Sequence, residues 1–377
     1  MVPEIYCLRM HLGQVASEVN ALVEKRNNDA FVYKRINIFI DSLNELVEKI
    51  KEKDFSLMKD PDKKMTKVLL TYLSNCCLYL KSSAKEGLPP SIYSCLRQAL
   101  CDWIGSSKDY IMACHKGGVS EFYYALFFED NQIRKYIVDE YNVTFTHSLI
   151  PFAHPSFLEK DFFCNNTLYH ELGHFVDQKL KITEKILLLF ICQEKIPQET
   201  VYFKKINVSS LFPYDEKNPV CTKEAYVLYS YLKEYFADVF AAQYIANSNL
   251  HFLNYLAGDC EDSDDHPASQ SRIKLVQEFL GDPNAYGEFL KSLCNLTEKI
   301  TSHKLERRYV DVDSSSFNRK EKTVISGDNE LHTMFINAWK YLVESGCNAE
   351  GDPVKSYLVI NDLINESIRE YVDSKPS

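Results

Sequence analysis

The chain lacks an apolar run long enough to cross a membrane. Its most apolar stretch, residues 186–192, is only seven residues long, whereas a spanning helix needs about 20. The first residues also lack the basic segment and following apolar segment that mark a secretory signal. We therefore expect a protein that is not inserted in a membrane and that works in the cytoplasm.

Clusters of Lys and Arg are also missing. The chain has 43 Lys and Arg against 53 Asp and Glu, a net charge of -10, and no long basic stretch. Binding to nucleic-acid phosphates depends on such clusters, so we expect no nucleic-acid partner. The 45% of hydrophobic and 25% of charged residues are ordinary for a globular protein, which predicts a sizeable core.

The 12 cysteines are scattered, and no two have the CxxC spacing that marks many zinc and redox sites. Because no export signal is recognised, we expect them to be reduced and mostly buried. The chain also has no internal repeat and no low-complexity segment.

The hydrophobic pattern predicts helices in most of the chain. Apolar residues recur at helical spacing in residues 36–50 and 68–80. Aromatic or alternating stretches at 122–128 and 143–150 are typical of strands, and Pro151 and Pro155 are expected to end regular pairing. Further helices are predicted at 166–180, at 223–246, after Pro267, at 330–345 and at 354–372.

This order predicts an α+β fold that is mostly helical. We expect an N-terminal helical region at residues 1–110 and a C-terminal helical region at 301–377. Residues 111–300 between them are expected to form the functional domain, with a small sheet and a helix that carries the site.

Residues 170–174 read His-Glu-Leu-Gly-His. On a helix, positions i and i+4 share one face, so His170 and His174 can bind one zinc ion, and Glu171 can reach a water on the metal. Gly173 leaves room for another backbone to approach, and Asn166 or Thr167 can cap the start of the helix. The alternative is two partly buried histidines with ordinary hydrogen bonds.

A catalytic zinc ion needs a third protein ligand and an open position. Residues 234–238 read Glu-Tyr-Phe-Ala-Asp. Glu234 can bind the metal, while Asp238, one turn later, can accept the other ring N–H of a zinc histidine. Ala237 and Ala241 are small enough for close packing against the first helix. The alternative is a solvated acidic pair.

The sequence HELGH followed by a helix with E-x-x-x-D resembles the gluzincin group of metallopeptidases. The resemblance implies a zincin-like core in which His170, His174 and Glu234 hold zinc. It also implies that Glu171 is the general base and that Asp238 supports a metal ligand.

Residues 266–273 resemble the HP-x-x-x-x-RI stretch of CAAX prenyl proteases and their bacterial membrane relatives. The resemblance implies that His266 stabilises the developing oxyanion. It also implies that Arg272 holds an active-site carboxylate or the substrate. The alternative is a helix start with Pro267 near its first position and a surface His and Arg.

Together these features predict a selective peptidase that cleaves a protein or peptide substrate by metal-assisted hydrolysis, with Zn²⁺ as its cofactor. They specify neither the substrate nor the oligomeric state. Two other hypotheses remain, a zinc-binding regulatory protein without activity and a metal-free helical scaffold. Other candidate residues are expected to serve in packing or in loops, namely Tyr226, Tyr229, Tyr231, Tyr235, His147 and His154.

Overall fold

The computed structural model divides into two compact units. The first consists of Met1–Pro89 and Ser106–Lys160, and the second of Pro90–Gly105 and Asp161–Ser377. The division expected from sequence, into regions 1–110, 111–300 and 301–377, stays a prediction. The structure describes residues 4–27, 34–83, 88–105, 109–117, 123–124, 131–155, 161, 163–192, 202, 223–248, 250, 260–310, 315–346 and 353–374.

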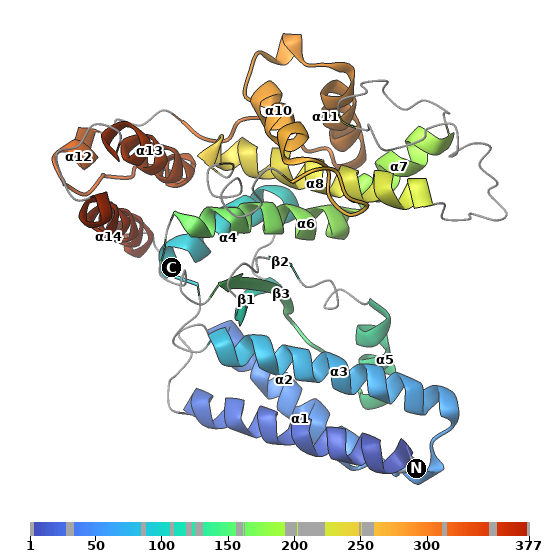
Figure 1. Cartoon of the computed structure of the whole chain (residues 1–377). Coiled ribbons are helices and arrows are strands. Elements are labelled where there is room, and N and C mark those ends of the chain that lie inside the picture. Colours follow the sequence, from blue (N-terminus) through green and yellow to red (C-terminus); the bar gives the residue numbers. More distant parts are fainter. Residues whose placement is uncertain are drawn as a thin grey trace. The chain divides into compact units, whose positions relative to one another are not determined.

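Four α-helices and a small sheet make up the described part of the first unit (Figure 1). In α2 the buried side chains recur every three or four residues, from Ile36 through Leu43 to Ile50, and this stripe packs into the core. The helices are α1 (Glu4–Asn27), α2 (Lys34–Lys51), α3 (Asp60–Ser83) and α5 (Asn131–Tyr141), with a 3-10 turn at Phe55–Leu57.

The sheet has the strand order β1-β3-β2. Strand β1 (Tyr110–Gly117) pairs in parallel with β3 (Ser148–Pro155), with Tyr110 opposite Ser148. Strand β2 (Tyr123–Tyr124) pairs antiparallel with β3. A parallel pair needs a crossover, and α5 lies on the connection between β1 and β3.

The position of β3 differs from the expectation from sequence. The prediction was a strand over 143–150 that ends at Pro151, but β3 begins at Ser148 and continues to Pro155. Strand β2 pairs only with Phe152 and Ala153, so one edge of Pro151 has no partner strand among the described residues. A proline, which has no N–H to donate, is tolerated at such an edge. Of the expected strand at 122–128, only residues 123–124 lie within the described residues.

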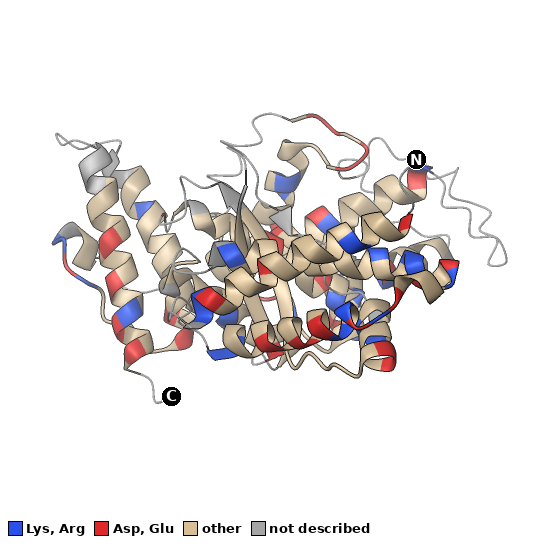
Figure 2. Ribbon diagram, turned by 90° about the horizontal axis from the view of Figure 1, so that it is seen from below, with Lys and Arg blue, Asp and Glu red and all other residues tan. Residues whose placement is uncertain are grey.

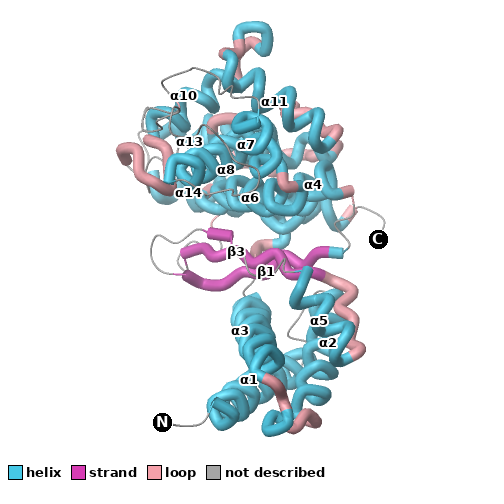
Figure 3. The backbone as a smooth tube through the Cα atoms, turned by 90° about the vertical axis from the view of Figure 1, so that its right-hand side faces the viewer, coloured by secondary structure: helices cyan, strands magenta, loops and turns pink. Residues whose placement is uncertain are grey.

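The described part of the second unit contains helices joined by loops and turns, and no strand, as Figure 3 shows by colour. Helix α8 is buried on nearly every side from Val227 to Ile245, as expected of a helix that is apolar all round. Helices α6, α7, α10 and α13 pack against it, and α4 packs against α6. The bounds are α4 Pro90–Ile104, α6 Leu168–Leu180, α7 Ile182–Cys192, α8 Lys223–Ile245, α10 Ser269–Phe279, α11 Glu288–Thr301, α12 Ser315–Asn318, α13 Asp328–Gly346 and α14 Pro353–Asp373, with 3-10 turns at Cys164–Thr167 and Pro283–Ala285.

The expected α+β, mostly helical fold class is confirmed. Acidic and basic residues are interspersed along the described helices (Figure 2). None of the described helices combines the length with the apolar composition that a bilayer crossing requires.

Candidate metal centre

Helix α6 presents His170 and His174 one turn apart. Their rings lie 4.6 Å apart between centroids and are nearly perpendicular. His170 is buried, whereas His174 is partly exposed. The spacing places both imidazoles on one face of the helix, as the sequence predicts.

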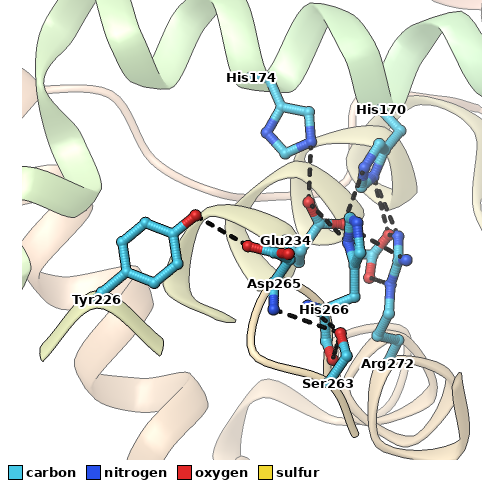
Figure 4. A network of polar contacts seen from close by, with 9 residues as sticks. His170, His174, Tyr226, Glu234, Ser263, Asp265, His266 and Arg272 are labelled. Atoms are coloured by element: carbon cyan, nitrogen blue, oxygen red, sulfur yellow. Dashed lines mark hydrogen bonds and ion pairs between the residues drawn. The ribbon is translucent and has the colours of Figure 1, made fainter. Parts of the chain in front are cut away.

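Helix α8 brings Glu234 to this pair of histidines (Figure 4). Its Oε2 lies 3.4 Å from Nε2 of His170, and its Oε1 lies 3.3 Å from Nε2 of His174. The ligand atoms of all three residues lie within 4.8 Å of one another. The predicted convergence of two imidazoles and a distant carboxylate is therefore confirmed, and the three side chains can hold a metal ion.

The ligand atoms lie close enough together to surround one metal ion. Bonds of about 2.0–2.2 Å at tetrahedral angles separate neighbouring ligand atoms by about 3.3–3.6 Å. Each imidazole nitrogen lies near this separation from one oxygen of Glu234, at 3.4 Å for Oε2 and His170 and at 3.3 Å for Oε1 and His174. Two nitrogens and one carboxylate oxygen also form a donor set that zinc binds in enzymes. Three protein ligands leave a fourth position for water or substrate.

Close packing of α6 on α8 sets this geometry. A Cβ atom added to Gly173 would lie 2.9 Å from Cα of Ala237 and 3.2 Å from Cβ of Phe240. Real Cβ atoms do not approach a backbone atom so closely, so the two helices can pack at this distance only with glycine at position 173. The structure thus supplies the reason for a glycine inside the helix, where it costs about 1 kcal/mol relative to alanine.

The substitution Gly173→Ala is expected to push α6 away from α8. We expect it to lower the free energy of unfolding by about 1–3 kcal/mol, as overpacking does, and to weaken metal binding because the ligands separate. Gly13→Ala in α1 is the matched control, because no atom lies within 4 Å of the added Cβ. That variant should be as stable as wild type or more stable, by up to about 1 kcal/mol. Denaturant unfolding measures both, and a Gly173→Ala protein of wild-type stability would contradict this account.

A buried carboxylate supports the first histidine. Asp238 is fully buried, and its Oδ1 accepts the Nδ1–H of His170 at 2.9 Å. This bond orients the ring and leaves Nε2 free to bind a metal. Arg272 of α10 donates to the same carboxylate through Nε and Nη2, both at 2.7 Å. The side chain of Arg272 also lies 3.4 Å from Glu234, so one guanidinium fixes two carboxylates.

The charges of the site shift the pKa values of Glu234, Asp238 and His170. For Glu234, burial raises the pKa, but the nearby His174 and Arg272 outweigh it and hold the pKa well below its usual value. The pKa of Asp238 is lowered in the same way, against burial, chiefly by Arg272. Burial lowers the pKa of His170, but its bonds to Asp238 and Glu234 prevail and raise it to about 10. The cluster therefore favours positive charge at the position that the three ligands surround.

Glu171 is buried beside the first ligand on α6. Its charge helps to raise the pKa of Arg272, against the effect of burial and after the larger contributions of Asp238 and Glu234. Glu171 makes no hydrogen bond or ion pair to another residue within the described parts of the chain. A buried carboxylate is costly without a polar partner, so a water or ligand is the natural partner for this one.

His266 approaches the same centre from a loop. Its Nδ1 lies 3.5 Å from Oε1 of Glu234, and 63% of its side chain is exposed. Contact with Glu234 raises the pKa of His266. The loop is held by Ser263, whose Oγ accepts the backbone N–H of His266 at 2.9 Å, and by Tyr226, which donates to Asp265 at 2.8 Å (Figure 4).

Tyr231 and Tyr235 do not join the cluster. Tyr231 donates to the carbonyl of Ser263, and Tyr235 donates to the carbonyl of Tyr202, so neither hydroxyl contacts a ligand. His147 and His154 belong to the first unit. The supporting role of Ser263 and Tyr231 in the His266 loop was not predicted, since no sequence pattern links an α8 tyrosine to a loop carbonyl.

The start of α6 also differs from the expectation. Thr167 makes no side-chain capping bond, and Asn166 donates instead to the carbonyl of Ser248 at 2.8 Å. The preceding 3-10 turn, Cys164–Thr167, provides backbone carbonyls such as that of Asn165 for the first N–H groups of α6. The helix therefore needs no side-chain cap.

Comparison with protein-family models, with curated proteins and with solved structures found no match for this chain. The geometry of the cluster is therefore the basis for a proposed function.

Proposed function

We propose that the chain is a zinc-dependent peptidase. The observation that carries the proposal is the convergence of His170, His174 and Glu234, whose ligand atoms lie within 4.8 Å of one another. Zinc bound there would polarise a scissile carbonyl and lower the pKa of a bound water toward about 7. A largely buried ligand set, with the carboxylate of Glu171 beside it, is the arrangement that metal-assisted hydrolysis requires.

In this proposal Glu171 is the general base. It is buried next to His170 and has no hydrogen-bond partner among the described residues. Its carboxylate accepts a proton from the attacking water and passes it to the leaving nitrogen. A site that only stores metal has no use for such a carboxylate, which favours an enzyme over an inactive zinc-binding regulator.

His266 and Arg272 have different roles in this proposal. His266 is largely exposed yet lies beside Glu234, so its ring can donate a hydrogen bond to the oxyanion that develops on the substrate. Arg272 is buried and bonded to Asp238 and Glu234, so it positions those carboxylates and does not contact the substrate.

We further propose that the peptidase is selective and acts in the cytoplasm. Cys76, Cys77 and Cys95 are buried and form no disulfide. Burial raises the pKa of the Cys77 and Cys95 thiols to about 12, which keeps them protonated and inert. Buried, unreactive thiols suit a reducing compartment.

The proposal predicts that a chelator abolishes peptide cleavage. Purified protein is incubated with casein, with and without 1,10-phenanthroline, and the fragments are counted by mass spectrometry. The wild-type protein should cleave, lose that activity after chelation and dialysis, and regain it with about one equivalent of Zn²⁺ per chain. Binding of one zinc without any cleavage would favour the regulatory alternative. Protein without metal and without activity would favour the scaffold.

A further inference from the structure

A second polar site lies in the same unit as the metal centre. A pocket of about 420 Å³ opens between α4, residues 307–310 and the start of α13. Its charged lining consists of Asp102, Arg307, Arg308 and Asp328, together with the buried ring of His332. Two positive and two negative side chains thus line one small pocket.

Arg308 is fixed in place but retains a nitrogen that makes an ion pair without a hydrogen bond. Its Nε donates to Oε1 of Gln243 at 3.3 Å, and its Nη2 donates to the carbonyl of Lys304 at 3.4 Å. Its Nη1 lies 3.6 Å from Oδ2 of Asp102, beyond hydrogen-bond distance. Over the described ranges Nη1 has no hydrogen-bond acceptor, so a ligand can provide one.

His332 also has an unused nitrogen. The residue is only 1% exposed, and its Nδ1 shares a hydrogen bond of 2.7 Å with the hydroxyl of Tyr169. Burial lowers its pKa to about 3, so the ring is neutral at physiological pH. Its Nε2 makes no hydrogen bond to the parts of the chain that the structure describes, and the residue lines the pocket.

The acidic side of the pocket also has capacity for a ligand. Asp102 accepts from Gln98 at 3.3 Å through Oδ1 and from Tyr244 at 3.1 Å through Oδ2. Each carboxylate oxygen can accept two hydrogen bonds, so both have room for a further donor. The Asp102 side chain is partly exposed, which gives a ligand access to it.

We propose that this pocket binds a small zwitterion of the α-amino acid class. The ligand's carboxylate meets Arg308 and its ammonium group meets Asp102. A dianion such as phosphate would face two carboxylates, and a dication would face two guanidinium groups, whereas a zwitterion pairs with both signs. Small-molecule pockets measure about 300–1,000 Å³, so this one is suited to a ligand of amino-acid size.

Binding can be tested with defined probes. L-leucine, L-glutamine and L-phenylalanine are titrated singly into the full-length protein by calorimetry, beside propionate, propylamine and inorganic phosphate. We expect at least one amino acid to bind with a Kd of about 1 mM or tighter, and the three singly functional probes to bind at least about tenfold more weakly. If no amino acid binds at about 10 mM, or if propionate or phosphate binds as tightly as the best of them, the proposal is wrong.

Two variants locate the binding in this pocket. Arg308→Gln and Asp102→Asn are each expected to weaken the best probe by about tenfold or more, because each removes one charged partner. Asp102→Asn keeps an acceptor for Tyr244, so it remains informative if Arg308→Gln fails to fold. Arg319→Gln, which changes an exposed arginine paired with Glu321 outside the pocket, is the matched control and should bind like wild type. Wild-type affinity in folded Asp102→Asn protein would overturn the proposal.

Discussion

Replacement of Glu171 by Gln is expected to lower the rate of peptide cleavage by about 10²- to 10⁴-fold and to leave the zinc content unchanged. The amide has nearly the same shape as the carboxylate but cannot accept the proton of the attacking water. Glu171 is absent from the cluster of ligand atoms, so its loss should not release the metal. Initial rates on casein and elemental analysis of the same preparation measure the two effects.

The matched control for this experiment is Glu184→Gln on α7. Glu184 is exposed and lies 3.6 Å from Lys181, and it contacts none of the metal ligands. We expect this variant to cleave and to bind zinc like wild type, because exposed ion pairs contribute little. A Glu171→Gln protein that cleaves as fast as this control would remove Glu171 from the mechanism.

Replacement of Glu234 by Gln is expected to have the largest effect on the metal. The neutral amide is a poor zinc ligand, and partners outside the ligand set already change metal affinity by about 10- to 100-fold. We therefore expect zinc affinity to fall by more than about 10²-fold, with loss of cleavage in dilute zinc. Competition with a chromophoric chelator measures the affinity, and circular dichroism checks that the helices remain.

Glu224→Gln provides the control on the same helix. Glu224 lies in the first turn of α8, where a negative charge interacts favourably with the helix dipole by at most about 1 kcal/mol. Its replacement should leave zinc affinity within about twofold of wild type, since it is not one of the clustered residues. Equal zinc affinity in the Glu234 and Glu224 variants would show that the carboxylate of Glu234 does not bind the metal.

Local patterns in the sequence predict helices such as α2, α6 and α8, whereas α5 and α7 were not predicted. The spacing of Ile36, Leu43 and Ile50 reports one face of α2 directly, because a helix repeats every 3.6 residues. His170 and His174 share a face for the same reason. Glu234 was predicted from the Glu-Tyr-Phe-Ala-Asp pattern of 234–238, in which Glu234 and Asp238 lie one turn apart, and the resemblance to a known family agrees with that prediction.

Features that depend on tertiary contacts could not be predicted in this way. The bond from Tyr169 to His332 joins residues 163 positions apart, and no periodicity reports such a pair. The continuation of β3 through Pro151 depends on how little of that strand β2 covers. The uncapped start of α6 depends on a 3-10 turn whose backbone replaces the side-chain cap. In each case a partner distant in sequence, or the backbone itself, outweighed the local preference.

The ligand set itself can be measured most directly by X-ray absorption at the zinc edge of protein loaded with one equivalent of Zn²⁺. The account predicts a first shell of nitrogen and oxygen only, with histidine nitrogens at about 2.0–2.1 Å and a carboxylate oxygen at about 2.0–2.2 Å. It also predicts that the histidine signal disappears in a His170→Ala, His174→Ala double variant. A shell containing sulfur at about 2.3 Å would place the zinc on cysteines and contradict the proposed centre.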